Sequence, residues 1–285
     1  MSVLSIHSRV SRGYVGNSAV VPALQALGRD VAAVDTVTLS NHPGHKTVTG
    51  RRVPAEEVGA MARAVLELAG VPSFRAVITG YMTGPDTARA AIGLVDRVKS
   101  ARTGALYICD PILGDREEGL YVDERLVPLF RGDALPRADV ALPNAFELER
   151  LTGDRVVDVG SAVAAAHALR ARGTGAVVVT SVPDHPDPDK GGMLIGTLAV
   201  DDEGEWLIEA PRLQRKAKGA GDVLAGLVTG HLLAGMSLRD AAAKATASVH
   251  AILEAADEDD LDLPLVRNRA LLSKPQREFV PQAVR

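Results

Sequence analysis

Short apolar runs alternate along this chain with longer alanine-rich stretches of helical periodicity. The apolar runs are rich in β-branched residues and do not alternate strictly with polar ones, as at 3–6, 31–37 and 76–79, and helical patterns such as 17–27 and 85–101 lie between them. Largely apolar strands without strict alternation indicate a sheet that is covered on both faces. Alternating strands and helices connect parallel strands through right-handed crossovers. The sequence therefore predicts an α/β fold, a single three-layer α/β/α domain with a central, mostly parallel sheet.

The same patterns place the other elements. Further strands are expected at 106–109, 139–142 and 177–180, and an antiparallel pair is expected at 193–200 and 205–208. Further helices are expected at 54–69, 144–151, 161–172, 221–234 and 238–255. An α/β domain can take up all 285 residues, and we find no internal repeat or low-complexity linker. We therefore expect one domain over residues 1–285.

Composition excludes several classes of protein. Hydrophobic residues make up 46% of the chain, which argues against disorder, and the net charge of -4 with 3% aromatic residues argues against nucleic-acid binding. No apolar stretch approaches the roughly 18 residues that a membrane span needs. The single cysteine, Cys109, excludes an internal disulfide framework and fits a reducing, cytoplasmic compartment.

Acids, amides and glycines follow the predicted strands. In open parallel sheets, ligands bind beyond the carboxyl ends of the strands, so these are the residues to consider for a site. They are Ser8, 13–17, 40–44, 79–81, Asp110, Pro111, Gly114, Asp115, Pro143, Asn144, Glu147, Thr180, Ser181 and 219–222. The topology alone brings them to one edge of the sheet.

The segment Gly219-Ala220-Gly221-Asp222 opens a predicted helix. Glycines at that place let backbone N–H groups converge on an anion at the positive end of the helix. Asp222 could then be a general base beside a bound phosphate, or simply an N-terminal capping carboxylate. The chain contains no Walker-type phosphate loop and no G-x-G-x-x-G dinucleotide motif.

Three carboxylates and an amide lie beside this segment in the predicted topology. Asn144 and Glu147 are three residues apart and share a helix face, and Asp110 and Asp115 follow the neighbouring strand. Oxygen ligands of this kind suit a hydrated Mg²⁺ that bridges to substrate phosphates. The alternative is that they are ordinary loop and capping acids.

The histidines show no metal-binding spacing. We expect His7 and His250 to be buried core residues, and His167, His185 and His231 to lie on the surface or to be satisfied within helices. Cys109 ends a strand and is expected to be a buried, inert thiol.

Taken together, the motifs resemble the ribokinase-like superfamily, and specifically the pyridoxal kinases. The resemblance is collinear from residue 3 to about residue 255 and does not cover the tail after about residue 260. Its motifs are Val3-Leu4-Ser5-Ile6-His7-Ser8, Arg12-Gly13-Tyr14-Val15-Gly16-Asn17, Ser40-Asn41-His42, Thr79-Gly80-Tyr81, Cys109-Asp110-Pro111 with Gly114-Asp115, Pro143-Asn144 with Phe146-Glu147, Thr180-Ser181 and Gly219 to Asp222.

This resemblance implies ATP-dependent phosphorylation of the 5′-hydroxymethyl group of pyridoxal and related B6 vitamers by a homodimer, with Mg²⁺ and a possible role for K⁺. It implies that Asp222 is the catalytic base and that Gly219, Ala220 and Gly221 form the anion hole. The implied vitamer contacts are Ser8, Asn41, His42 and Tyr81. The implied ATP contacts are Asp110, Asp115, Tyr121, Asn144, Glu147, Thr180, Ser181, Gly219 and Gly221, with Asp110 and Glu147 also serving the metal.

Two positions depart from the family pattern. Pro43 stands where pyridoxal kinases usually have Thr, and Leu142 stands where Thr is usual before Pro-Asn. The first bears on vitamer preference and the second on K⁺ dependence. Two alternatives stay open: a kinase of another hydroxymethyl compound, such as hydroxymethylpyrimidine or a sugar, and a weakly active vitamer-binding protein. Ser8 and Tyr81 favour a flat heteroaromatic substrate, whereas Asp222 and the glycines argue against binding alone.

Overall fold

A single α/β domain is built around one large sheet in the computed structural model, which describes residues 2–187, 191–215 and 217–284. Within these ranges the sheet has ten strands in the order β12-β11-β10-β9-β8-β5-β4-β1-β2-β3. Their bounds are β1 (Ser2–Val10), β2 (Asp30–Leu39), β3 (Gly50–Arg52), β4 (Phe74–Thr79), β5 (Leu106–Cys109), β8 (Val140–Ala141), β9 (Ala176–Pro186), β10 (Met193–Val200), β11 (Glu205–Pro211) and β12 (Gln282–Ala283).

The centre of the sheet is parallel and its edges are antiparallel. Strand β1 pairs in parallel with β2 and β4, and the parallel pairing continues through β5, β8 and β9. The predicted antiparallel pair is present as β10 and β11, and β10 also pairs antiparallel with β9. The carboxyl ends of the central strands therefore meet at one edge, as the sequence predicts.

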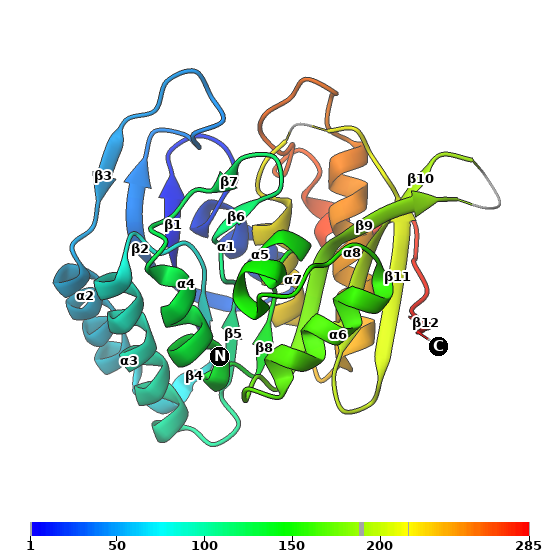
Figure 1. Ribbon diagram of the computed structural model, residues 1–285. Helices are drawn as coiled ribbons and strands as arrows, with labels where there is room; N and C mark the ends of the chain where they lie inside the picture. Colours follow the sequence, from blue (N-terminus) through cyan, green and yellow to red (C-terminus); the bar gives the residue numbers. More distant parts are fainter. Residues whose placement is uncertain (1, 188–190, 216, 285) are drawn as a thin grey trace.

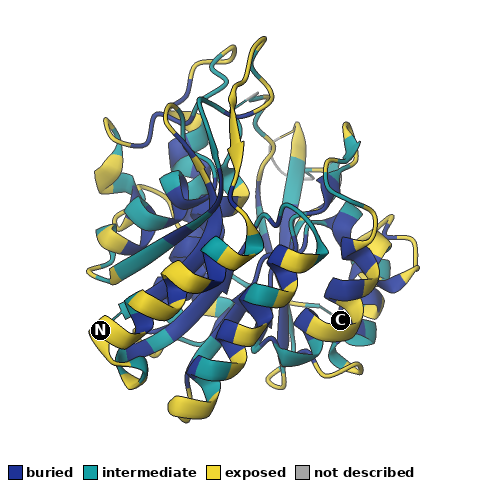
Figure 2. Ribbon diagram, turned by 90° about the vertical axis from the view of Figure 1, so that its left-hand side faces the viewer, coloured by how far each residue is buried: buried dark blue, intermediate teal, exposed yellow. Residues whose placement is uncertain are grey.

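Helices cover both faces of the sheet (Figure 1). Apolar residues of α2, α3, α4, α5 and α6 pack on one face, and those of α1, α7 and α8 pack on the other. Figure 2 shows the result, with buried strands between helices whose outer surfaces are exposed. The helix bounds are α1 (Asn17–Ala26), α2 (Ala55–Ala69), α3 (Pro85–Ala101), α4 (Leu126–Leu129), α5 (Ala145–Thr152), α6 (Val159–Arg170), α7 (Ala220–Leu232) and α8 (Leu238–Glu254).

Alternate residues of the strands supply the two cores. Along β1, Leu4 and Ile6 belong to the core under α2 and α3, whereas Val3 belongs to the core under α1 and α7. The largely apolar runs that predicted a doubly covered sheet are explained by this alternation. The prediction of a three-layer α/β/α fold is confirmed.

Several small elements escaped the sequence patterns. A hairpin of two-residue strands, β6 (Gly114–Asp115) and β7 (Gly119–Leu120), follows β5, and the short helix α4 follows the hairpin. Strands of two residues carry no detectable periodicity. The tail is largely irregular, although Gln282 and Ala283 pair with β11. None of the described helices combines the length and the apolar character needed to cross a bilayer.

Candidate active site

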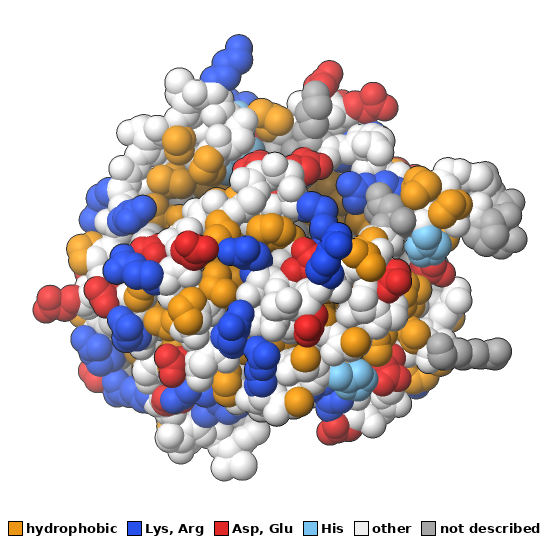
Figure 3. All heavy atoms as spheres, in the orientation of Figure 1, with side chains coloured by type: hydrophobic (Ala, Val, Ile, Leu, Met, Phe, Trp, Pro, Cys, Tyr) orange, Lys and Arg blue, Asp and Glu red, His pale blue; other side chains and the backbone are white. Residues whose placement is uncertain are grey.

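A cavity of about 480 Å³ opens at the carboxyl ends of the central strands. Most of the side chains that the sequence singled out line it, together with residues from the hairpin and from the start of α7. The lining includes His7, Ser8, His42, Pro43, Gly44, Tyr81, Asp110, Asp115, Glu118, Tyr121, Leu142, Asn144, Glu147, Thr180, Ser181 and 217–222. Seen as spheres, the molecule is hollowed near this edge, with acidic and basic side chains beside the hollow (Figure 3).

The N-terminus of α7 faces this cavity without a side-chain cap. Gly219 is its N-cap residue, with φ at 102°, and no side chain of the described residues accepts a hydrogen bond from the first-turn N–H groups. A Cβ atom at residue 219 would lie 1.8 Å from the backbone oxygen of Tyr14, so only glycine fits there. Uncapped N–H groups at the positive end of a helix form an anion-binding site.

Asp222 lies in the first turn of α7 and is buried. It makes no capping hydrogen bond, so the alternative of a capping carboxylate does not describe it. Instead its Oδ1 lies 2.9 Å from Nε2 of His7 on β1. The two atoms are not aligned for a hydrogen bond, and neither has another hydrogen-bond partner among the described residues. A group that binds next to both atoms can therefore engage both.

His7 was expected to be a buried core residue; it is buried, and it also lines the cavity. The backbone N–H of Ser8 donates to its Nδ1 at 2.8 Å, and that of Tyr81 lies at 3.4 Å. Nδ1 is therefore an acceptor, which leaves the proton of a neutral imidazole on Nε2, the atom beside Asp222. The ring occupies a slot beside Gly80, where a Cβ atom would come within 1.9 Å of Nε2.

Two more buried carboxylates share the cavity. Glu147 and Asn144 form a capping box at the start of α5, in which the Glu147 carboxylate accepts hydrogen bonds from the N–H groups of Asn144 and Leu113, both at 2.9 Å. Burial raises the pKa of Glu147 to about 8. Burial, followed by the charges of Glu147 and Asp222, also raises the pKa of Asp110 well above its usual range. This excess of buried negative charge suits a cation.

The hairpin β6–β7 is joined to the segment before α7 by a basic residue that sequence reasoning missed. Lys218 Nζ donates to Glu118 Oε1 at 2.8 Å and lies 3.6 Å from Asp115 Oδ2. Tyr121 donates its hydroxyl to the same Asp115 oxygen at 3.1 Å. Lys218 thus places a cation directly before the anion-binding turn. Its position next to Gly219 in the sequence is the only signal that could have identified it.

The opposite wall of the cavity comes from β1, the segment after β4 and the loop after β2. Ser8, Tyr81, His42 and Pro43 lie there. Asn41 is not among the lining residues; its side-chain amide donates to the backbone oxygens of Thr47 and His42 and so shapes the loop itself. His42 is buried, and its Nε2 lies 3.0 Å from the backbone oxygen of Leu261.

The remaining predicted residues lie beside the end of β8. The strand expected at 177–180 is longer in the structure, so Thr180 and Ser181 lie within β9 (Ala176–Pro186) and not after it. Thr180 pairs with Asn144 through a parallel bridge, and Ser181 beside it has a positive φ of 52°, which is unusual for a residue with a side chain. Leu142 lines the same wall. Cys109 is buried below the cavity, and burial raises the pKa of its thiol to about 12, which agrees with an inert thiol.

Solved structures show that this is the fold of a ribokinase-like kinase. The pyridoxal kinase of Leishmania donovani in complex with ADP and pyridoxamine superposes with a TM-score of 0.89 and 28% identity, over 100% of this chain and 99% of that one. The pyridoxal kinase of Entamoeba histolytica superposes with a TM-score of 0.89 and 26% identity, over 99% of both chains.

Sequence comparisons identify the family to which the chain belongs. The family model described as phosphomethylpyrimidine kinase matches residues 16–261. Pyridoxal kinase PdxY of Corynebacterium diphtheriae is 35% identical over 98% of both chains, and that of Rubrobacter xylanophilus is 41% identical over 89% of this chain and 87% of its own length. The chain therefore belongs to the phosphomethylpyrimidine kinase family and, within it, to the pyridoxal kinases.

Proposed function

We propose that this chain transfers the γ-phosphoryl group of ATP to the 5′-hydroxymethyl group of pyridoxal and related B6 vitamers. The observation that carries the proposal is the arrangement at the start of α7. An uncapped helix N-terminus and a buried first-turn carboxylate face the same cavity. The relatives' names and the complexes with ADP and pyridoxamine support the same reaction.

In the proposed mechanism the vitamer lies against Ser8 and Tyr81, with its 5′-hydroxyl beside Asp222. Asp222 takes the hydroxyl proton while the hydroxyl oxygen forms a bond to the γ-phosphorus. The bond from that phosphorus to the β,γ-bridging oxygen breaks, and ADP leaves with this oxygen. The N–H groups of the α7 N-terminus stabilise the negative charge on the transferring phosphoryl group. A primary alcohol is a poor nucleophile, so positioning and charge neutralisation supply most of the rate.

The nucleotide phosphates would lie along the wall formed by Asn144, Thr180 and Ser181, within reach of Lys218. Tyr121 and Asp115 come from the hairpin at the cavity mouth. In the proposed complex this hairpin limits the access of water, which would otherwise accept the phosphoryl group.

The donor set fits Mg²⁺, which prefers hard oxygen ligands. When bound with ATP, Mg²⁺ neutralises phosphate charge. The Asp110 carboxylate would hold it, because burial and two neighbouring carboxylates disfavour the ionised form of Asp110 without a cation. Glu147 contributes charge, but its oxygens already accept backbone hydrogen bonds. Leu142 offers no oxygen where the family usually has Thr, so we expect weak dependence on K⁺.

We expect a homodimer from the family resemblance alone. Cytoplasmic location is supported by the single, buried cysteine. The folded chain is also expected to form one functional domain over residues 1–285.

The proposal is tested by incubating the chain with ATP, Mg²⁺ and pyridoxal and identifying the product by mass and chromatography. We expect pyridoxal 5′-phosphate and equimolar ADP. ADP without the phosphorylated vitamer would refute the assignment. The matching family model favours one second candidate, a hydroxymethylpyrimidine kinase, and the same assay with that alcohol distinguishes the two.

We expect the free energy of unfolding of the metal-free chain to decrease as the pH rises from about 4.5 to about 8. A carboxyl whose pKa rises from 4.5 to about 8 on folding holds its proton more tightly in the folded state. The free energy of unfolding therefore falls with pH in this window, by up to about 1.4 kcal/mol per pH unit for each such group.

Mg²⁺ should counteract this loss because it competes with the protons. Thermal unfolding with and without Mg²⁺ should show a larger rise in Tm at pH 8.5 than at pH 5.5. Glu147→Gln should flatten the pH dependence of the metal-free Tm. A Mg²⁺ effect that is the same at both pH values would contradict the cation assignment.

We expect a substitution of His7 to change kcat more than the KM for ATP. His7→Leu removes the Nε2–H group that can donate to a substrate group bound beside Asp222. We expect kcat to fall by about 10- to 100-fold, the worth of a hydrogen bond to a charged group. The KM for ATP should stay nearly constant. His7→Gln retains an N–H donor and should recover much of the loss. His250→Gln changes a buried histidine outside the cavity and is the control. Equal losses in both His7 variants would contradict the donor role.

Pro43→Thr should lower the KM for pyridoxal. Pro43 lines the cavity and has neither a hydroxyl nor a backbone N–H to offer the vitamer. One neutral hydrogen bond is worth about 0.5–1.5 kcal/mol, which is at most roughly tenfold in affinity. Steady-state kinetics should show this gain for pyridoxal with an unchanged KM for ATP. An unchanged KM and vitamer ranking would place the loop outside the substrate contacts.

A further inference from the structure

A second cluster of ligand-type side chains lies beside the cavity mouth, away from the proposed Mg²⁺ site. His42 and His45 come from the loop after β2, and Asp262 comes from the segment that follows α8. One ligand atom from each lies within 4.8 Å of the other two. Nε2 of His42 and Nε2 of His45 each lie 3.3 Å from the same carboxylate oxygen, Asp262 Oδ1.

These distances match those between ligands of a bound metal ion. In a tetrahedral site with metal–ligand bonds of about 2.1 Å, neighbouring ligand atoms lie about 3.4 Å apart. Two imidazoles and one carboxylate with one open position are a common zinc ligand set. We propose that His42, His45 and Asp262 form a binding site for a borderline divalent cation such as Zn²⁺, which joins the loop after β2 to the segment after α8.

The surroundings make room for such an ion. The His45 and Asp262 side chains are about a quarter exposed, so the site is open to solvent on one side, whereas His42 is buried beneath them. A Cβ atom at Gly13 would lie 2.3 Å from Asp262 Oδ1, so the carboxylate occupies space that a side chain at residue 13 would fill. Arg12 Nε lies 3.8 Å from the other carboxylate oxygen and competes only weakly for it.

The protonation state of His42 suits a ligand. Burial, followed by the neighbouring His45, lowers its pKa, so the ring is neutral near pH 7. In the metal-free chain Nδ1 accepts a hydrogen bond from the Gly44 N–H at 3.2 Å, and Nε2–H faces the Leu261 oxygen. Metal binding at Nε2 moves this proton to Nδ1 and breaks both contacts. The ring stays neutral, and these losses reduce the affinity relative to a preformed site.

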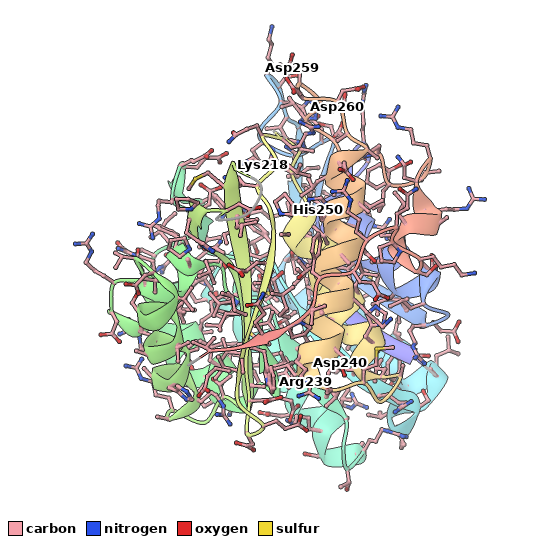
Figure 4. The ribbon with its side chains drawn as sticks, turned by 90° about the vertical axis from the view of Figure 1, so that its right-hand side faces the viewer. Lys218, Arg239, Asp240, His250, Asp259 and Asp260 are labelled. Carbon is pink, nitrogen blue, oxygen red and sulfur yellow. The ribbon has the colours of Figure 1, made fainter. Side chains whose placement is uncertain are left out.

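The position of the proposed site determines which parts of the structure a bound ion would hold together. Pro43 and Gly44, which line the cavity, lie between the two histidines in the sequence. Figure 4 places Asp259 and Asp260, just before Asp262, at the end of the molecule that carries Lys218, opposite Arg239 and Asp240. A bound ion therefore fixes the vitamer side of the cavity mouth against the tail. This inference does not depend on which alcohol the cavity phosphorylates.

The test uses the full chain after chelation, titrated with Zn²⁺ by calorimetry and with Co²⁺ by visible absorption. With excess Mg²⁺ present to occupy the proposed site at Asp110, we expect one Zn²⁺ site per chain and a Co²⁺ spectrum typical of four-coordination with nitrogen ligands. His45→Gln and Asp262→Asn should each weaken binding by about 100-fold or more, since even the loss of an outer partner typically costs 10- to 100-fold. His167→Gln, which removes a histidine from a two-residue pair with Glu205, should bind as the unaltered chain does.

Two further readouts separate loss of the site from loss of the fold. Without metal, His45→Gln and Asp262→Asn should each have a Tm within a few degrees of that of the unaltered chain. His45→Gln should also keep its activity with ATP and Mg²⁺. Zn²⁺ should raise the Tm of the unaltered chain but not that of the variants. If the unaltered chain binds no Zn²⁺, or if both variants bind it equally well through another site, the proposal is wrong.

Discussion

Asp222→Asn should abolish most phosphoryl transfer and leave the fold intact. The amide keeps the size of the carboxylate but cannot take the proton of the hydroxyl group. A general base typically contributes 10²- to 10⁴-fold, and we expect a loss of about this size in kcat. ATP binding should persist, because the N–H groups of α7 and Lys218 are unchanged.

Asp240→Asn is the matched control. Asp240 occupies the first turn of α8, as Asp222 does in α7, but its backbone N–H is capped by Ser237 and it lies at the opposite end of the molecule (Figure 4). It should retain normal turnover. If Asp222→Asn turned over at a rate near that of the unaltered chain, the proposed proton transfer would be refuted.

Gly219→Ala should cause a comparably large loss by a different route. The new methyl group would lie 1.8 Å from the Tyr14 oxygen, so either the start of α7 or the loop 13–15 must move. The alanine would also have to adopt a φ of 102°, which is unfavourable for any residue with a Cβ atom. Because donors misplaced by about 1 Å can cost 10²-fold in rate, we expect kcat to fall by about 100-fold with weaker ATP binding.

Gly235→Ala separates the effect of the unfavourable φ from the effect of the collision with Tyr14. Gly235 has a φ of 87°, but no described atom lies within 4 Å of the position that a Cβ atom would take there. This variant introduces the backbone strain without the collision, so it should lose stability and keep its activity. Equal kinetic losses in both variants would show that the contact with Tyr14 does not position the anion-binding turn.

The sequence predicted the parts of the site that are local in the chain. The anion-binding turn and its carboxylate are four consecutive residues, and Asn144 and Glu147 belong to one capping box. The topology rule then placed them at one sheet edge, because parallel strands share the direction of their carboxyl ends. The structure brings these residues together around one cavity, and their catalytic roles remain predictions.

The contacts between distant segments could not be predicted. His7 lies beside Asp222 only because β1 and α7 are neighbours in the folded chain, and no local pattern distinguishes it from a core histidine. The hydrogen bonds of the Asn41 amide to the backbone of its own loop have no sequence signal, and its contact with the substrate stays a prediction. The His42, His45 and Asp262 cluster joins segments far apart in the sequence, with spacing that matches no metal motif.

The most direct test of the proposed function is a competition between pyridoxal and 4-amino-5-hydroxymethyl-2-methylpyrimidine for limiting enzyme in the presence of ATP and Mg²⁺. The ratio of the two kcat/KM values measures which alcohol the cavity favours in the transition state. We predict that pyridoxal is favoured by about tenfold or more. A preference for the pyrimidine, or no phosphorylation of either alcohol, would contradict the assignment.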